Sequence, residues 1–302
     1  MSKTRRVYFV QSVAKQYRKP FFDSLHARLA NIDINLQILY SAPNSVEVHR
    51  GDNIDLPKNY GHKVKASWLL NNKLVIQMLP AAIWHADLVI VDQANKFVMN
   101  YPLMLAAKLG MIKLAYWGHG RNRQAKNNDI SERLKKRMLT AVDWWFAYTK
   151  GVADYIASCG YPPAQITAVQ NSIDTSGFAK QLAQVSDDEV LQLRTALGLP
   201  DDARVGLYCG GLHTDKRLSD LVDACRTIHQ REPRFHLLVA GAGVSQRVIE
   251  EASTEHPWLH YLGPRFGADK ATLFKLGELF LCPGLVGLAV LVAFAAGLPL
   301  IT

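Results

Sequence analysis

The stretch VGLYCGGLHTDKRLSDLVDA, residues 205–224, holds the clearest candidate for a binding site in the sequence. Gly210 and Gly211 follow an apolar run that is typical of a buried strand, and Lys216 and Arg217 precede an amphipathic helix. Glycines let a ligand approach the backbone, a helix N-terminus offers free N–H groups, and a lysine adds positive charge. The combination suits a diphosphate, although it is neither a Walker loop nor a G-x-G-x-x-G motif. A tight turn with a solvated lysine would have the same sequence.

Two further glycine turns follow apolar runs. VAGAGVSQRV, residues 239–248, is typical of either ligand contact or close packing of a strand against a helix. AYWGHGRNR, residues 115–123, places His119 between two glycines, with Arg121 and Arg123 close behind. The carboxyl edge of a parallel sheet is where α/β domains bind ligands, so His119 is either a hydrogen-bond donor to a ligand or a structural histidine.

The elements that must position these residues alternate regularly along the chain. Apolar runs predict strands at residues 6–11, 35–40, 62–68, 87–92, 113–117 and 145–148, and then at 204–208, 236–241, 259–263, 279–283 and 298–302. Helical patterns lie between them at residues 20–29, 74–84, 102–109, 131–142, 218–230, 245–252, 269–277 and 287–296. This pattern predicts an α/β protein with two Rossmann-like, doubly wound domains that face each other across a cleft.

Residues 279–302 are uncharged and mostly apolar, a length that could span a bilayer. Glycines and prolines divide this segment into strand, turn, helix, turn and strand, and no basic cluster flanks it. We therefore expect a buried βαβ unit rather than a transmembrane helix.

Composition excludes several classes of protein. The chain has 302 residues, of which 49% are hydrophobic and 20% charged, so it is not intrinsically disordered. Its four cysteines form no CxxC pair, which argues against a disulfide framework or a cysteine zinc site. The apolar run near the N-terminus, residues 7–10, is too short for a signal peptide. We expect a cytoplasmic location, with the inner face of the cell membrane as a possible site of action.

Charge is distributed unevenly between the two halves of the chain. Residues 1–180 hold 24 Lys and Arg against 12 Asp and Glu, whereas residues 181–302 hold 11 against 14. A basic first half is consistent with a solvated surface, an anionic membrane, a phosphate-bearing substrate or nucleic acid. The cluster Lys135, Lys136 and Arg137 favours a membrane surface that carries a lipid-linked acceptor.

Five passages in order resemble retaining glycosyltransferases of family 4 (group 1), which have the GT-B architecture, and in particular members that assemble bacterial polysaccharides. They are YRKPFFDSL (17–25), WGHG (117–120), GYPPAQITAVQNSID (160–174), GGLHTDK (210–216) and CPGLVGLAVLVAFAAGLPLIT (282–302). Each match is loose, but their order is specific, and together they extend over nearly the whole chain.

The resemblance implies an acceptor-side domain at residues 1–175, a linker at 176–203 and a nucleotide-sugar donor domain at 204–302. Such a protein transfers a sugar from a nucleoside diphosphate sugar to a glycan or lipid-linked acceptor with retention of configuration, in cell-surface polysaccharide synthesis. The sugar nucleotide is a substrate, and no cofactor, metal or nucleic acid is implied.

The resemblance also assigns roles to residues. His119 is expected to reach the transferred sugar as the catalytic residue. The residues expected to bind the donor phosphates are Gly210, Gly211, Lys216 and Arg217. Those expected at the donor sugar are Gly284, Leu285, Val286 and Val292, and those on the acceptor side are Tyr17 and Arg18.

Three departures predict a poor or inactive enzyme. Gly211 stands where the family commonly has arginine, and Gly284 and Val292 stand where it has the two carboxylates of E-x7-E. The sequence also ends at Thr302, before elements with which family members continue, so we expect the donor domain to be incomplete. The alternative is a basic nucleic-acid-binding or non-catalytic α/β protein, suggested by the stretch RNRQAKNN at residues 121–128. No stacking platform or recognition-helix motif supports that alternative.

Overall fold

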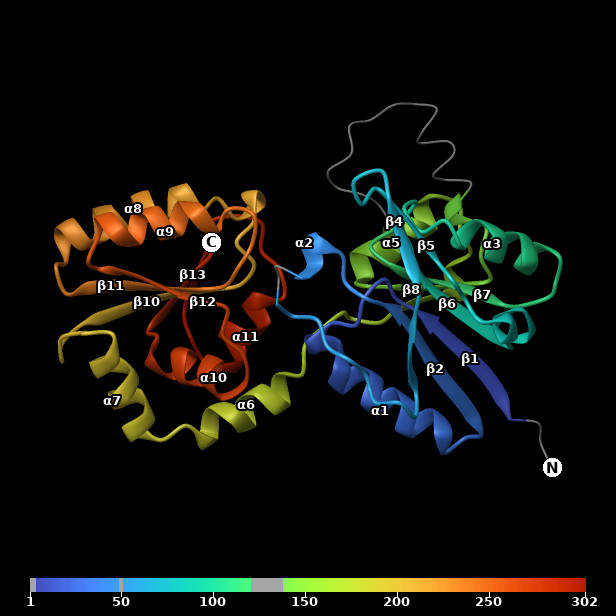
Figure 1. The fold of residues 1–302 in the computed structure, drawn as a ribbon, viewed down its shortest axis with the longest axis horizontal. Coiled ribbons are helices and arrows are strands. Elements are labelled where there is room, and N and C mark those ends of the chain that lie inside the picture. The colour runs from blue at the N-terminus through green and yellow to red at the C-terminus, as the bar shows by residue number, and fades with distance from the viewer. Residues whose placement is uncertain (1–3, 49–50, 121–137) are drawn as a thin grey trace. The chain divides into compact units, whose positions relative to one another are not determined.

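The computed structural model describes residues 4–48, 51–120 and 138–302 and divides the chain into two α/β units (Figure 1). The first unit comprises Met1–Ser45 and Asp52–Asn171, and the second comprises Val46–Gly51 and Ser172–Thr302. Each unit is built on a parallel sheet, which confirms the predicted α/β class with two Rossmann-like domains.

The first unit contains a seven-stranded sheet in the order β3-β2-β1-β6-β7-β8-β9, and every neighbouring pair in it is parallel. The strands are β1 (Arg5–Val10), β2 (Ile34–Ser41), β3 (Gly61–Val64), β6 (Leu88–Asp92), β7 (Leu114–Gly118), β8 (Trp144–Ala147) and β9 (Ile166–Ala168). The described helices are η1 (Gln16–Arg18), α1 (Lys19–Ala30), η2 (Ala81–His85), α3 (Asn100–Lys108), α5 (Lys150–Ser158) and η3 (Pro163–Gln165), and the short α2 (Ser45–Val48) spans the boundary between the units.

Both faces of this sheet are buried, because successive side chains of a strand point to opposite faces. On β1, Val7 and Phe9 pack in one hydrophobic cluster with Phe22 of α1. Tyr8 and Val10 pack in a second cluster on the other face. The continuous apolar run of β1 therefore follows from helices covering both sides of the sheet.

The region of residues 62–84 differs from the prediction. The expected strand at 62–68 is divided into β3 and β4 (Ala66–Leu69), and the expected helix at 74–84 is instead β5 (Leu74–Gln77) followed by η2. β4 and β5 form an antiparallel hairpin, and its turn residues Asn71 and Asn72 adopt left-handed backbone conformations. Asparagine tolerates that conformation, so the Asn-Asn pair was a turn signal that the sequence analysis passed over.

The second unit contains a five-stranded parallel sheet in the order β12-β11-β10-β13-β14. Its strands are β10 (Arg204–Cys209), β11 (Phe235–Ala240), β12 (Leu259–Gly263), β13 (Leu279–Leu281) and β14 (Leu300–Ile301). Its helices are α6 (Thr175–Gln184), α7 (Asp187–Ala196), η4 (Thr214–Lys216), α8 (Leu218–Arg231), α9 (Gln246–Glu255), α10 (Gly267–Leu276) and α11 (Ala289–Ala295). These elements follow the predicted alternation closely.

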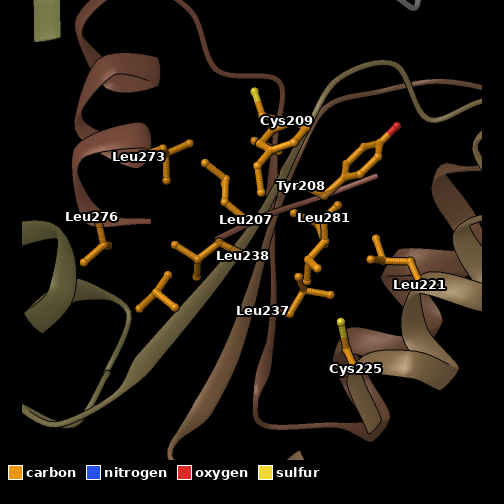
Figure 2. Packing of buried hydrophobic residues seen from close by; sticks show 14 of the residues in the cluster. Leu207, Tyr208, Cys209, Leu221, Cys225, Leu237, Leu238, Leu273, Leu276 and Leu281 are labelled. Atoms are coloured by element: carbon orange, nitrogen blue, oxygen red, sulfur yellow. The ribbon is translucent and has the colours of Figure 1, made fainter. Parts of the chain in front are cut away.

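The core of this unit is a sheet between two helical layers. Figure 2 shows Leu273 and Leu276 of α10 on one side of the sheet and Leu221 and Cys225 of α8 on the other. The sheet between them supplies residues such as Leu207, which is fully buried. This arrangement leaves the carboxyl ends of the strands to carry loops.

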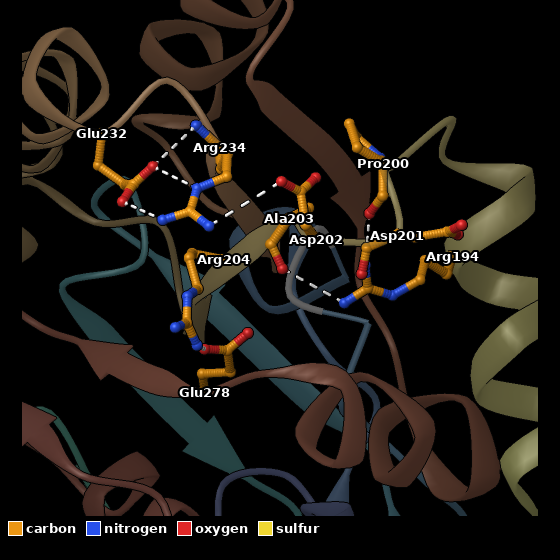
Figure 3. Close-up of polar contacts among 9 residues, drawn as sticks. All are labelled: Arg194, Pro200, Asp201, Asp202, Ala203, Arg204, Glu232, Arg234 and Glu278. Atoms are coloured by element: carbon orange, nitrogen blue, oxygen red, sulfur yellow. Dashed lines mark hydrogen bonds and ion pairs between the residues drawn. The ribbon is translucent and has the colours of Figure 1, made fainter.

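Residues 176–203, the expected linker, belong to the second unit. Phe178 of α6 packs edge-on against Phe274 of α10, with ring centroids 5.4 Å apart. Ser186 and Glu189 form a capping box that starts α7. Arg194 of α7 donates hydrogen bonds to the carbonyl oxygens of residues 200, 201 and 203 (Figure 3). The polar composition of the segment predicted a connection between domains, but its few apolar side chains are enough to anchor two helices.

The apolar segment 279–302 folds as β13, α11 and β14, as the βαβ prediction required. In the part of the chain that the structure describes, no helix combines the length and apolar character needed to cross a bilayer.

Candidate functional site

The topology of the second sheet brings the loops after β10 and β13 together. From β10 the chain adds β11 and β12 on one side and then returns to add β13 on the other, so β10 and β13 flank the point where the strand order reverses. Open α/β sheets bind ligands at the carboxyl ends of the strands at such a switch point. The glycine-rich stretch that follows β10 therefore lies where the fold favours a ligand.

Lys216 ties these two loops together. Its side-chain ammonium group donates a hydrogen bond to the carbonyl oxygen of Leu285, and the backbone N–H of Leu285 donates to the carbonyl oxygen of Asp215 at 2.8 Å. The Lys216 side chain is only 16% exposed, and its Nζ lies 3.9 Å from an Asp215 carboxylate oxygen. The charged ammonium group of Lys216 is thus held by a backbone carbonyl oxygen at the carboxyl edge of the sheet.

Three glycines let the loops of this edge approach backbone to backbone. A Cβ atom at Gly284 would lie 2.4 Å from the Asp215 carbonyl oxygen. A Cβ at Gly241 would lie 1.9 Å from the Gly210 carbonyl oxygen, and one at Gly243 would lie 2.2 Å from that of residue 212. No side chain fits at these distances, so the loops after β10, β11 and β13 depend on glycine for their contact.

Gly210 and Gly211 have different surroundings. A Cβ at Gly210 would make only ordinary contacts, the nearest at 3.7 Å, whereas one at Gly211 would press on the His213 imidazole at 2.8 Å. The Gly211 carbonyl oxygen accepts a hydrogen bond of 2.8 Å from the Tyr208 hydroxyl. Gly210, Gly211, Lys216, Gly284 and Leu285 therefore belong to one cluster of loops.

Two residues expected to bind the nucleotide-sugar donor, Arg217 and Val292, do not belong to this cluster of loops. Arg217 adopts a left-handed backbone conformation, with φ of 53°, and its guanidinium pairs with Asp220 in the first turn of α8. Val292 is buried and packs in the hydrophobic cluster of the second unit, so its side chain is part of the core and not of a ligand surface. The pattern E-x7-E identified the position of Val292, but the sequence did not show that this side of α11 faces the hydrophobic core.

The remaining expected residues line the loop after β13. Leu285 and Val286 are exposed there, and Gly287 would place a Cβ 3.9 Å from the Lys216 ammonium nitrogen. Burial raises the pKa of the Cys282 thiol at the start of this loop, although Lys216 opposes the shift. Cys282 therefore stays protonated near neutral pH and is a poor nucleophile.

The first sheet has its own switch point, between β1 and β6. Arg18, which ends η1, lies there and is largely buried. Its guanidinium donates hydrogen bonds to the Gln11 amide oxygen, to the Tyr148 hydroxyl at 2.5 Å and to the Tyr17 hydroxyl at 2.9 Å. One guanidinium nitrogen lies 3.9 Å from an Asp92 carboxylate oxygen. Residues at the carboxyl ends of three strands, β1, β6 and β8, thus converge on one arginine.

In the cluster around Arg18, the guanidinium of Arg18 and the carboxylate of Asp92 each stabilise the charged form of the other. Burial raises the pKa of Asp92, while Arg18 and the Gln11 amide, which donates to the carboxylate at 2.8 Å, oppose the shift. Burial would lower the pKa of Arg18, but Asp92 and the neighbouring hydroxyls outweigh it and raise that pKa. The guanidinium is therefore permanently charged and held in a fixed orientation.

His119 lies beside this cluster, at the end of β7. It is exposed, and its imidazole meets the Tyr148 ring edge-on, with centroids 4.4 Å apart. Tyr17, Arg18 and His119, which were predicted from the sequence, share this edge of the first sheet. Arg121, Arg123 and the basic cluster Lys135, Lys136 and Arg137 lie outside the described residues.

Gln11, Asp92 and Tyr148 were not predicted as site residues, although each is a polar residue at or just beyond the end of an apolar strand. Trp117, whose ring centroid lies 6.0 Å from the Arg18 guanidinium carbon, was not predicted either. The Trp117 indole nitrogen is buried and finds no hydrogen-bond acceptor among the described residues. In that same part of the chain, no group of three or more His, Cys, Asp or Glu side chains is arranged to hold a metal ion.

Comparison with known proteins agrees with this architecture. Residues 203–302 match the family model described as "Glycosyl transferases group 1". No curated protein sequence matches the chain.

Solved structures match almost the whole chain. A glycosyltransferase from Rickettsia africae superposes with a TM-score of 0.66 at 12% identity, covering 99% of this chain and 79% of its own. The Anabaena protein HepE in complex with UDP and glucose superposes with a TM-score of 0.63 at 14% sequence identity, and the match covers 98% of this chain and 80% of HepE. The UDP-GlcNAc 2-epimerase of Methanocaldococcus jannaschii superposes with a TM-score of 0.57 at 14% sequence identity, and the match covers 98% of this chain and 82% of the epimerase.

The chain therefore has the GT-B fold, with two Rossmann-like units. The structural matches have low sequence identity and establish the fold alone. The family match of the second unit, together with that fold, supports a glycosyltransferase-type protein.

Proposed function

We propose that the protein is a retaining glycosyltransferase of the group 1 type that takes its sugar from a nucleoside diphosphate sugar. The observation that carries the proposal is the Lys216 cluster of glycine-rich loops at the switch point of the unit whose sequence matches group 1 glycosyltransferases. Support for the donor class comes from HepE, whose structure holds UDP and glucose. We further propose a glycan or lipid-linked acceptor and a role in cell-surface polysaccharide synthesis, as the sequence resemblance implies.

In this reaction the bond between the anomeric carbon and a phosphate oxygen breaks. A bond forms between that carbon and an acceptor hydroxyl oxygen, and the hydroxyl proton is released. The diphosphate leaves with the electron pair and gains negative charge, so a fixed cation beside it stabilises the transition state. Lys216 supplies that charge in our proposal, exchanging its hydrogen bond to the Leu285 carbonyl oxygen for one to the phosphate.

The first unit holds the acceptor side in this proposal. Arg18 is charged and oriented, which suits positioning of polar or anionic groups of an acceptor. His119 is exposed beside it and can donate a hydrogen bond to the transferred sugar. No metal or other cofactor is part of the proposal.

Binding of nucleotides tests the donor site directly. We expect UDP or GDP to bind in calorimetric titrations and Lys216→Met to weaken that binding about 10- to 100-fold, because a charge-assisted hydrogen bond is lost. Lys180→Met, on an exposed position of α6, is the control and is expected to bind like the parent.

Turnover with a panel of nucleotide sugars and acceptors then tests the transfer, and the anomeric configuration of the product tests retention. If the chain binds only an oligonucleotide, with a steep dependence on salt, it is a nucleic-acid-binding protein and the proposal is wrong. If it interconverts two UDP sugars without an acceptor, it is an epimerase with the same fold.

A further inference from the structure

The β4–β5 hairpin of the first unit carries apolar side chains on both of its faces. Its register pairs Ser67 with Ile76 and Leu69 with Leu74 on one face, and the other face holds Trp68 and Val75. The face with Val75 is the inner one, because Val75 is 1% exposed. The outer face carries Leu69 and Ile76, which are 43% and 36% exposed, and continues to Met78, 68% exposed.

One polar residue, Gln77, shares the inner face with Val75 and Trp68. The Gln77 side chain is buried, and its amide donates to the Gln11 carbonyl oxygen at 2.8 Å and to the Ser41 hydroxyl at 2.9 Å. An antiparallel hairpin on a protein surface normally turns its apolar face inward and its polar face to water. Here the outer face is apolar as well, and it is unpartnered among the described residues.

The hairpin turn adds a strained, exposed leucine. Leu70 has a φ of 51° and is 69% exposed. The left-handed region is unfavourable for a leucine, and an exposed side chain gains nothing from burial to offset that cost. The turn therefore presents an apolar side chain at the tip of the hairpin.

Positive charge surrounds this apolar face. Lys65 lies opposite Met78 in the hairpin, Lys73 follows the turn, and both are exposed. From Asp55 to Asp87 the sequence has four lysines and no carboxylate between the two aspartates. Neither Lys65 nor Lys73 forms an ion pair with another described residue. An apolar centre with a lysine rim complements an anionic lipid surface.

We propose that the outer face of the β4–β5 hairpin docks the protein on an anionic membrane, with Leu70 and Met78 in the interface and Lys65 and Lys73 at the lipid headgroups. The inner face of the hairpin holds Gln11, whose side chain contacts Arg18 and Asp92. Docking through the hairpin therefore brings the Arg18 cluster close to the lipid surface. This inference does not depend on the proposed glycosyl transfer.

Vesicle sedimentation of the full chain at low salt tests this docking. We expect binding to vesicles that contain phosphatidylglycerol and much weaker binding to pure phosphatidylcholine. The double variant Leu70→Asn/Met78→Gln should weaken binding to anionic vesicles about tenfold or more. Lys65→Gln and Lys73→Gln should each weaken it about fivefold.

The variants are chosen to keep the fold. Asparagine suits the left-handed turn better than leucine, so Leu70→Asn should leave thermal stability unchanged or raise it. Leu191→Gln, at an exposed leucine of α7, is the matched control and should not affect vesicle binding. UDP binding of all variants should equal that of the parent, which separates this test from that of the donor site.

Three results would overturn the proposal. One is a parent chain that fails to bind anionic vesicles at low salt. Another is a Leu70→Asn/Met78→Gln variant that binds them as the parent does. The third is a parent dimer in light scattering that the same double variant dissociates, since a second copy of the chain would then cover this face.

Discussion

Gly284 shows how a single residue defines the candidate donor site. Its lack of a side chain lets the loop after β13 lie against the backbone of Asp215 and Lys216, and this contact orients the lysine. The family carboxylate expected from the resemblance would not fit here without moving a loop. The glycine is thus required by this packing.

We predict that Gly284→Ala weakens both stability and nucleotide binding. The added Cβ would lie 2.4 Å from a carbonyl oxygen, and relief of such a clash by backbone movement costs about 1–3 kcal/mol. Denaturant unfolding and UDP titration measure the two effects. Gly287→Ala in the same loop is the stability control, because its Cβ would make only an ordinary contact, 3.9 Å from the Lys216 ammonium nitrogen; an equal loss of stability in the two variants would contradict the loop packing described.

Val292 is the second residue at which a family-like substitution has a predictable result. Its side chain lies in the core, so Val292→Glu should lower the free energy of unfolding by on the order of 3 kcal/mol, because a carboxylate would be buried without a partner. Urea unfolding measures the loss. Phe294→Glu, at an exposed position of the same helix, should stay within about 0.5 kcal/mol of the parent. A stable Val292→Glu variant with tighter nucleotide binding would instead place residue 292 in the site.

At the scale of elements, two adjacent strands of the second unit carry a pair of histidines. His236 of β11 and His260 of β12 lie with ring nitrogens 3.0 Å apart and share a hydrogen bond. Burial lowers the pKa of His236, and His229 of α8 and Arg194 of α7 lower it further. Burial and His236 also lower the pKa of His260. The fold therefore holds both rings neutral.

This pair predicts a loss of stability in acid. The pKa of each histidine is lower in the folded state than its unfolded value of about 6.5, so the unfolded chain binds more protons below that pH. The contribution of the pair to stability is present above about pH 6.5 and is lost as the pH falls below it. Urea unfolding at pH 7.5 and pH 5.0 measures this.

The change between the two pH values should be smaller for His236→Asn/His260→Asn than for the parent. His62→Asn, at an exposed histidine of the first unit, should behave as the parent. An acid loss that is the same in the double variant would mean that the pair does not titrate on unfolding.

At the scale of the whole molecule, each unit has a hydrophobic core and a switch point of its own. The first unit builds two clusters on the faces of its sheet, and the second builds one around β10, β11 and β13. In each unit the candidate residues lie at the carboxyl ends of strands, at or near the switch point. The charge asymmetry between the halves follows the same division, with the lysine-rimmed hairpin in the basic half.

The sequence by itself determined the α/β class and most of the elements of the second unit. It also predicted that Lys216 and His119 would follow the carboxyl ends of strands. These features follow from local patterns, because apolar runs, helical periodicity and glycine turns are properties of neighbouring residues. The βαβ fold of residues 279–302 could be predicted for the same reason.

Only the tertiary structure decided which side chains meet. It placed the polar stretch 176–203 in the second unit and the Val292 side chain in the hydrophobic core. It also made residues 74–77 a strand, because pairing with β4 and burial of Val75 and Gln77 outweighed the helical pattern of this segment. These outcomes depend on contacts between residues that are distant in sequence, or on which face of an element is covered, and the order of residue types does not encode either directly.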